Sequence, residues 1–199
     1  FGSDGARWDN RWMDRWGNNY YFFGNGVRAT SQLANIGNAT YLFDDQGRLQ
    51  RDRFLGQNGK LYYFGNDGKE YKDQFYNNWG HTYYFGPDGA RYTNQFYTNW
   101  GHTYYFGTDG ARWDNRWMTN SDGKKFYFTS VGSRAESKYL GIDGNTYYFD
   151  NNGVATSWGK VYYDNPTTKQ IATGWRTING NHYYFSDGYD VQPDPDDLW

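Results

Sequence analysis

The sequence predicts an all-β fold, a β-solenoid of tandem β-hairpin repeats of about 21 residues. One reason is that the segment 78–97, which reads NWGHTYYFGPDGARYTNQFY, is followed by a near copy at 99–118. Another is the constant spacing of 21 residues between the first aromatic residues of a recurring Tyr-Tyr-Phe motif, at Tyr20, Tyr41, Tyr62, Tyr83 and Tyr104. A block this short cannot bury its own apolar side chains, so successive repeats must stack on one another.

The turns of the predicted hairpins lie just before each Tyr-Tyr-Phe motif. A glycine stands three residues before the first ring, and Asn or Asp often precedes it. Such pairs favour two-residue hairpin turns, because both turn residues need a positive φ angle. The pairs are Asn58-Gly59, Asp122-Gly123, Asp143-Gly144 and Asn179-Gly180. A second glycine six residues after the first ring closes a connector, so each repeat is a hairpin plus a glycine-bounded connector.

Counting outward from a two-residue turn places Phe75 opposite Tyr84 and Tyr76 opposite Tyr83. This register sorts the side chains onto two faces. The face with Tyr76, Tyr83 and Phe85 has Leu55, Met118 and Leu140 as its members in other repeats and is the predicted core. The face with Phe75, Thr82 and Tyr84 alternates rings with a polar residue, which predicts a half-solvated groove.

A ring beside an amide is a suitable binding site for a sugar, because sugars have an apolar C–H face and an equator of hydroxyl groups. Phe75, Tyr84 and Gln74 offer this combination. The alternative is that the rings only hold the hairpin together as a cross-strand pair. The candidate glycan-binding residues of this type are Phe75, Tyr84, Phe96, Tyr105, Trp117, Tyr127, Trp175, Tyr184, Gln74, Gln95, His81 and His102.

Composition excludes several other classes of function. Aromatic residues make up 23% of the 199 residues, so rings must supply most of the buried apolar area. The formal net charge is −2, which does not fit binding to a nucleic-acid backbone. No cysteine occurs, and no apolar run is long enough to span a bilayer. We therefore expect neither nucleic acid nor membrane insertion.

The sequence also predicts no catalysis, metal or cofactor for this chain. His81 and His102 stand in successive repeats and His182 in a later one, so they would point apart, whereas metal ligands must converge on one ion. Glu70 and Glu136 are the only glutamates. Asp67, Asp88 and Asp109 have a sufficient role as turn residues. The acidic residues of the tail fit a solvated segment better than a calcium site.

The Tyr-Tyr-Phe motifs, the Asp-Gly connectors and the Thr-Gly-Trp of 173–175 resemble cell-wall and glucan-binding repeats. Such repeats form the glucan-binding domains of glucansucrases from lactic acid bacteria, and are similar to choline-binding repeats. The resemblance extends from residue 1 to about residue 188. It implies a secreted or cell-surface protein of a Gram-positive bacterium, with a sucrose-using catalytic domain elsewhere in the full-length protein.

Differences between these relatives favour α-glucan over choline. Choline-binding repeats place Trp directly before the two tyrosines, as one wall of an aromatic cage for a quaternary ammonium. Here that position is Thr82 or Thr103 in the central copies. Glucan-binding repeats tend to have Thr there and Lys one residue earlier, and Lys60 occupies that Lys position, which makes it a further candidate. Two alternatives stay open. The chain could attach to the cell wall through choline or teichoic acid, or it could be a structural spacer or adhesin stalk.

The repeat domain is expected over residues 1–190, as a single solenoid, and an acidic, proline-containing tail or linker over 191–199. Residues 1–13 match 106–118, so the sequence begins inside a repeat, and we interpret the chain as a fragment of a larger protein. Within that protein we expect it to be monomeric. The expected partner is an α-glucan polysaccharide or a cell-wall polymer.

Overall fold

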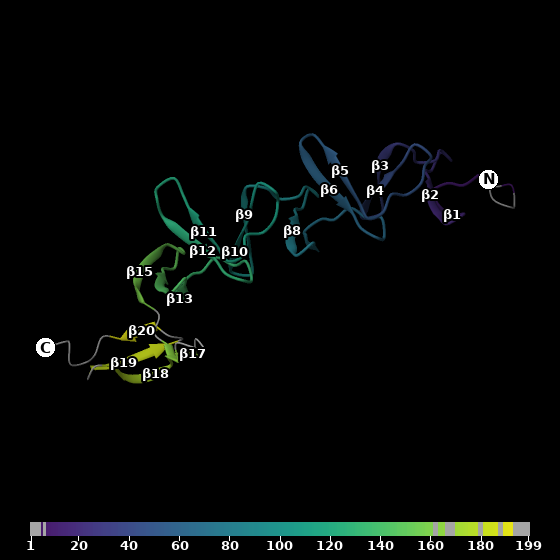
Figure 1. Cartoon of the computed structure of the whole chain (residues 1–199). Coiled ribbons are helices and arrows are strands. Elements are labelled where there is room, and N and C mark those ends of the chain that lie inside the picture. The colour runs from purple at the N-terminus through teal and green to yellow at the C-terminus, as the bar shows by residue number, and fades with distance from the viewer. Residues whose placement is uncertain are drawn as a thin grey trace. The chain divides into compact units, whose positions relative to one another are not determined.

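The computed structural model describes residues 5, 7–160, 163–165, 170–178, 181–186 and 189–192. Every regular element in these residues is a β-strand, so the all-β prediction is confirmed (Figure 1). None of the described residues forms a helix that is long and apolar enough to cross a membrane. The chain divides into two compact units: Phe1–Gln95 with Phe106–Arg112, and Phe96–Tyr105 with Trp113–Trp199. The predicted boundary at residue 190 stays a prediction, and residues 193–199 lie outside the described part.

Antiparallel hairpins follow one another along the chain, as predicted. They pair β1 (Arg11–Arg15) with β2 (Asn18–Phe22), β3 (Gln32–Ile36) with β4 (Ala39–Phe43), β5 (Arg53–Gln57) with β6 (Lys60–Phe64), β7 (Gln74–Asn78) with β8 (His81–Phe85), β9 (Gln95–Asn99) with β10 (His102–Phe106), and β11 (Arg116–Thr119) with β12 (Lys125–Phe128). Later sheets join β13 (Lys138–Ile142), β14 (Asn145–Phe149) and β15 (Ala155–Lys160); β16 (Tyr163–Asn165) and β17 (Gln170–Ile171); and β18 (Gly174–Ile178), β19 (Asn181–Ser186) and β20 (Tyr189–Gln192).

The register of β7 and β8 is the predicted one, with Phe75 opposite Tyr84 and Tyr76 opposite Tyr83. Two-residue turns set this register. At the tip of β5–β6, Asn58 and Gly59 have φ angles of 51° and 72°, the positive pair that a type I′ turn needs. The same holds at 143–144. The predicted turn at 179–180 lies outside the described residues.

The prediction of a two-residue turn at Asp122-Gly123 is wrong. Thr119 pairs with Lys125, so residues 120–124 form a longer tip between β11 and β12. The side chain of Asn120 accounts for the longer tip: its Oδ1 accepts hydrogen bonds from the backbone N–H groups of Asp122 at 3.0 Å and Lys124 at 2.9 Å. An Asn side chain that caps its own turn in this way stabilises a loop that needs no two-residue reversal.

Most described connector turns are held by an acidic or amide side chain, whereas the turn after β12 has a bond between the Thr129 and Ser133 hydroxyls. In the connector after β8, Asp88 Oδ1 accepts from the N–H of Ala90 at 3.0 Å, and the N–H of Gly89 donates to the carbonyl of Gly86 at 2.9 Å. Asp67 and Asp109 do the same one repeat earlier and one repeat later. The predicted role of these acids as turn residues is therefore confirmed.

Backbone hydrogen bonds from each connector join two successive hairpins. The N–H of Tyr92 donates to Tyr84 of its own hairpin at 2.9 Å, and the N–H of Arg91 donates to Leu61 of the hairpin before at 2.8 Å. The bond between hairpins recurs as Leu49 to Asn19, Glu70 to Thr40 and Arg112 to Thr82 in the first unit, and as Arg134 to Thr103 in the second. Within each unit the hairpins therefore stack as a solenoid.

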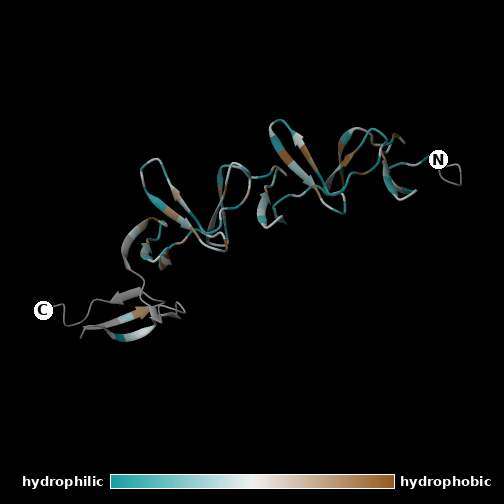
Figure 2. Ribbon diagram, viewed as in Figure 1, coloured by the Kyte–Doolittle hydropathy of each residue, from teal (hydrophilic) through white to brown (hydrophobic). Residues whose placement is uncertain are grey.

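The Phe of the Tyr-Tyr-Phe motif forms the core in the described repeats after the first, where Phe22 is only half-buried. In Figure 2 the hydrophobic segments lie on the strands of the hairpins. Full burial of one Phe side chain contributes about 2 kcal/mol to stability. The side chains that are less than 2% exposed are Phe43, Phe64, Phe85, Phe106, Phe128, Phe149 and Phe185.

Both faces of an internal hairpin contact a neighbour, so Tyr84 is buried where a half-solvated face was expected, although Phe75 on the same face is 37% exposed. Tyr84 is only 3% exposed, and its ring lies 6.2 Å from that of Phe106. One repeat earlier, Tyr63 packs against Tyr76 with ring centroids 4.5 Å apart. The predicted sugar face of one hairpin thus meets the predicted core face of the next, because a repeat in a stack has a neighbour on each side.

Candidate functional site

Three open grooves recur in the first unit, each between the tip of one hairpin and the connector that follows the next. The first groove is lined by Asn18 with residues from 31–56, the second by 38–40 with 66–74, and the third by 56–61 with 87–95. Their volumes are about 800, 350 and 760 Å³. Arg53, Gln74 and Gln95, spaced by one repeat, occupy the same place in the three grooves.

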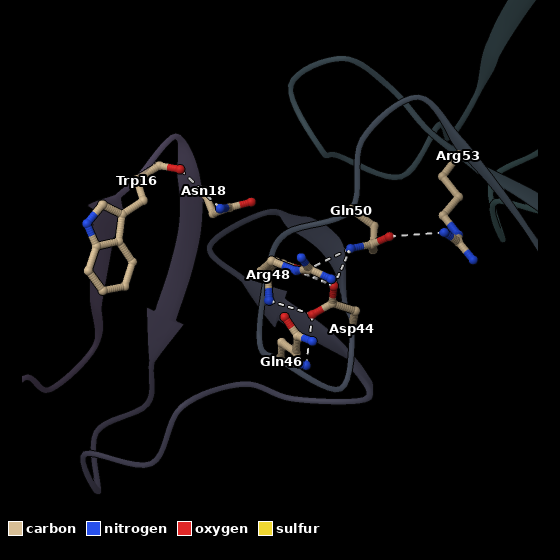
Figure 3. Close-up of polar contacts among 7 residues, drawn as sticks. All are labelled: Trp16, Asn18, Asp44, Gln46, Arg48, Gln50 and Arg53. Carbon is tan, nitrogen blue, oxygen red and sulfur yellow. Dashed lines mark hydrogen bonds and ion pairs between the residues drawn. The ribbon is translucent and has the colours of Figure 1, made fainter.

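Asp44 organises the polar side chains of the first groove (Figure 3). Its Oδ1 accepts from the backbone N–H groups of Gln46 and Arg48, and its Oδ2 accepts from Arg48 Nε at 2.8 Å and Gln50 Nε2 at 3.1 Å. Burial alone would raise the pKa of Asp44, but the hydrogen bonds and charge of Arg48 outweigh it and lower the pKa. Gln50 in turn accepts from Arg53 at 3.2 Å. The polar groups of this groove are therefore largely engaged with one another.

The second groove combines an ion pair with a tyrosine and an amide. Lys72 Nζ lies 3.0 Å from Glu70 Oε2, and it donates to Thr40 Oγ1 at 3.1 Å. Tyr71 and Gln74 complete the lining. The side-chain amide of Gln74 has no partner in the described part of the chain, so it is available to a ligand.

The third groove, one repeat later in the same unit, has the same combination of an ion pair, a tyrosine and a glutamine amide. Lys60 Nζ donates to Asp88 Oδ2 at 2.8 Å, and this bond, together with the N–H of Ala90, holds the pKa of Asp88 below its usual value. Tyr92 and Gln95 stand where the second groove has Tyr71 and Gln74. Among the described residues, none bonds to the amide of Gln95.

A separate aromatic pocket lies between the β5–β6 and β7–β8 hairpins. It has a volume of about 240 Å³ and is lined by Phe54, Leu61, Tyr76, Asn78, Trp79, Tyr83 and Arg91. The guanidinium carbon of Arg91 lies 5.5 Å from the centre of the Tyr83 ring. A cation already occupies that ring, so a second cation in the pocket would be repelled.

The structure brings some of the predicted site residues together. Lys60 and Gln95 line the third groove, and Gln74 lines the second. Phe75, Phe96, Trp175 and Tyr184 keep between 37% and 54% of their surface exposed. His81 and His102 are exposed beside hairpin tips.

Other predicted residues are mainly part of the packing. Tyr84 is buried, and Tyr105, Trp117 and Tyr127 are half-buried. Trp117, for example, stacks on Phe149 with ring centroids 5.9 Å apart. Their proposed contact with a glycan stays a prediction.

Sequence reasoning missed Trp79, which stands at the tip of β7–β8 and lines the aromatic pocket. It also assigned Tyr76 and Tyr83 to the core, whereas both are half-buried and line that pocket. The available signal was the Trp-Gly pair at 79–80, where Asn-Gly is the favoured turn sequence. A bulky residue at that position is unexplained by turn formation.

The described part of the chain is thus a series of β-hairpin repeats with open grooves between successive hairpins. A family profile described as "Putative cell wall binding repeat" matches residues 54–69, 142–155 and 173–188. These three segments are similar to that repeat, so the resemblance seen in the sequence is confirmed. A search of curated proteins gives no match.

Solved structures share this fold at low sequence identity. CbpJ from Streptococcus pneumoniae TIGR4 is 21% identical with a TM-score of 0.58, over 87% of this chain and 60% of that one. Choline binding protein F from the same species is 22% identical with a TM-score of 0.58, over 91% and 57%. The choline-binding domain of CbpL, also pneumococcal, is 22% identical with a TM-score of 0.52, over 92% and 97%. The chain thus spans less than two thirds of CbpJ and of choline binding protein F.

Proposed function

We propose that the chain binds α-glucan, a neutral dextran-like polysaccharide, through its second and third grooves. The observation that carries this proposal is the recurrence, one repeat apart, of a tyrosine beside an unpaired glutamine amide and an ion pair. The residues are Tyr71 and Gln74 in the second groove, and Tyr92 and Gln95 in the third.

The donors and acceptors of these grooves suit a sugar. The amides and the Lys and carboxylate groups can bond to hydroxyls, while a tyrosine offers apolar contact to a C–H face. The grooves are open, which lets a polymer enter along its length, where an enclosed pocket would take only a chain end.

The paired lysines of the grooves favour a neutral ligand over an anionic wall polymer, and Arg91, which also lines the third groove, lies against the ring of Tyr83. Lys60 is paired with Asp88, and Lys72 is paired with Glu70. A teichoic acid would need uncompensated cations for its phosphates. These pairs leave each lysine partly neutralised, so the phosphate of such a polymer would have to compete with a carboxylate.

Repetition gives weak sites a function. Several grooves on one chain that engage one polymer raise its apparent affinity through effective concentration, without any new contact. The chain then serves as a non-catalytic accessory module, at the cell surface or secreted, that holds a glucan for a larger protein such as a glucansucrase.

Affinity electrophoresis in gels with and without dextran tests the proposal. We expect the wild type to be retarded by dextran, and Gln74→Ala with Gln95→Ala to lose most of the retardation while unfolding at the same temperature. The matched control is Gln32→Ala, an exposed glutamine at the strand position of Gln74 two repeats earlier that lines none of the three grooves, and it should keep the retardation. Unchanged mobility of the wild type in dextran would rule out the glucan proposal.

The aromatic pocket is the observation that favours a second candidate, attachment to the wall through choline. Tyr76, Trp79 and Tyr83 provide rings for a quaternary ammonium. The guanidinium of Arg91 against Tyr83 disfavours it. Retention on a choline matrix and elution by free choline, without retardation by dextran, would support this candidate in place of α-glucan.

A further inference from the structure

Tryptophan occupies a strained backbone position at three hairpin tips. Trp16, Trp79 and Trp100 have φ angles of 51°, 49° and 47°. At the tip of β5–β6 the same position is held by Asn58, at 51°. Asn tolerates this left-handed region, whereas a bulky residue there is an outlier whose backbone is strained. Turn formation therefore does not explain why these positions hold tryptophan.

The indoles at these tips are also exposed to solvent. Trp79 is 82% exposed and Trp100 is 92% exposed, whereas the rings of the core are buried. Burial therefore does not explain them either. Trp16 is 80% exposed but differs in one respect, because the guanidinium of Arg15 lies 4.0 Å from the centre of its ring and covers one face.

Polar side chains surround Trp79. A cavity of about 460 Å³ is lined by Asn77, Asn78, Trp79, Gly80, His81 and Thr82. Thr82 Oγ1 donates to Asn77 Oδ1 at 2.8 Å, and Asn78 Nδ2 donates to the Tyr76 hydroxyl at 3.0 Å. These two bonds orient the amides and leave the Asn77 amide nitrogen and the Asn78 amide oxygen without a partner in the described part of the chain. His81 is exposed beside them.

We propose that the tip of β7–β8 is a second kind of carbohydrate site, separate from the grooves. A glycosyl ring stacks its C–H face on the indole of Trp79, while Asn77, Asn78 and His81 bind its hydroxyl groups. The tip of β9–β10 repeats the Asn-Trp-Gly-His sequence, with Trp100 as its platform. This inference rests on the proposed function, since it assigns further sites for the same class of polymer.

A lipid surface is a poorer match for these tips. The cavity at the tip is lined by amides, a threonine and an imidazole around Trp79, with no lysine or arginine, and Arg91 on the aromatic-pocket side lies against the ring of Tyr83. Anchoring at anionic membranes uses basic residues around the aromatic ones. Binding of the wild type to phosphatidylglycerol vesicles, lost in Trp79→Asn, would overturn the carbohydrate assignment.

The test separates binding from folding, because Trp79→Asn installs the residue that the turn prefers. We expect this variant to unfold at the same or a higher temperature than the wild type. Its dissociation constant for dextran should rise about two- to tenfold, as loss of one aromatic contact of 0.5–1.5 kcal/mol implies. Trp16→Asn is the matched control, since Arg15 already covers that ring, and it should leave the constant unchanged.

The converse variant adds a tryptophan ring to a hairpin tip that lacks one. Asn58→Trp should lower the unfolding temperature and strengthen retardation in dextran gels. A wild type that dextran retards and a Trp79→Asn variant that binds equally well would overturn this inference and leave the grooves as the site. A wild type that no glucan retards would overturn this inference together with the proposed function.

Discussion

The backbone N–H of Arg91 donates to the carbonyl oxygen of Leu61 at 2.8 Å, which ties the connector of one repeat to the hairpin of the repeat before. The same bond fixes the lining of the third groove and of the aromatic pocket, because Leu61 and Arg91 border both. Stability and binding therefore depend on the same contact between repeats, and variants have to be chosen to separate them.

The buried Phe of each motif should be more important for stability than the exposed ring on the opposite strand. Phe85 is fully buried and Phe75 is 37% exposed. We expect Phe85→Ala to lower the free energy of unfolding by about 3–5 kcal/mol. Phe75→Ala should cost clearly less. Urea denaturation followed by near-ultraviolet circular dichroism measures both, and equal losses would contradict the assignment of the core.

Two glycines with the same backbone conformation allow the contact between repeats to be measured. Gly80 and Gly89 have φ angles of 76° and 77°. A methyl group at Gly80 would meet nothing within 4 Å, whereas one at Gly89 would collide with the Glu70 carboxylate of the preceding repeat. Gly80→Ala should cost about 1 kcal/mol for the left-handed conformation alone. Gly89→Ala should cost more, because the pair with Lys72 holds the Glu70 side chain in place, and an equal loss would mean that this side chain moves aside at no cost.

Asp44 predicts a loss of stability in acid. Folding lowers its pKa, so its contribution is fully present above its unfolded pKa of about 3.9 and is lost as the pH falls through the folded value. The free energy of unfolding should therefore be level near neutral pH and decrease below about pH 4. In Asp44→Asn that decrease should be smaller. Asp45→Asn, at an exposed neighbour, is the control, and urea midpoints measured between pH 3 and 7 give the result.

The surroundings of Arg91 predict that a substitution at Thr93 can stabilise the protein. Its Nε is buried and has no hydrogen-bond partner in the part of the chain that the structure describes. Arg7 and Arg134 occupy the same position in other repeats, and each pairs with an acid two residues later, Asp9 and Glu136. The residue two positions after Arg91 is Thr93, which carries no charge. Thr93→Asp should supply the missing acceptor and raise stability by about 1 kcal/mol. Thr93→Asn tests whether charge is needed, and no gain from Thr93→Asp would show that the geometry does not repeat here.

Local patterns in the sequence were sufficient for much of the fold. The interval of 21 residues and the Asn-Gly pair at 58–59 predicted tandem hairpins and the register of Phe75 with Tyr84. The turn at 120–124 was missed, because an Asn side chain that caps a loop competes with the Asp-Gly signal beside it.

The candidate site was less predictable, because it forms between repeats. Counting along one hairpin separates its two faces but does not say that each face meets a neighbour, which is why Tyr84 was expected to be half-solvated. Gln74 and Gln95 were identified from their residue type, whereas the grooves around them depend on connectors from another repeat. Trp79 was overlooked because it lies outside the Tyr-Tyr-Phe motif on which the repeats were aligned.

Calorimetric titration with a short isomaltooligosaccharide, too short to bridge two grooves, tests the central claim most directly. Binding of more than one oligosaccharide per chain, reduced by Gln74→Ala and by Gln95→Ala in separate variants, is the predicted result. No heat of binding for the oligosaccharide, with saturable heat for choline, would contradict the assignment of these repeats to α-glucan.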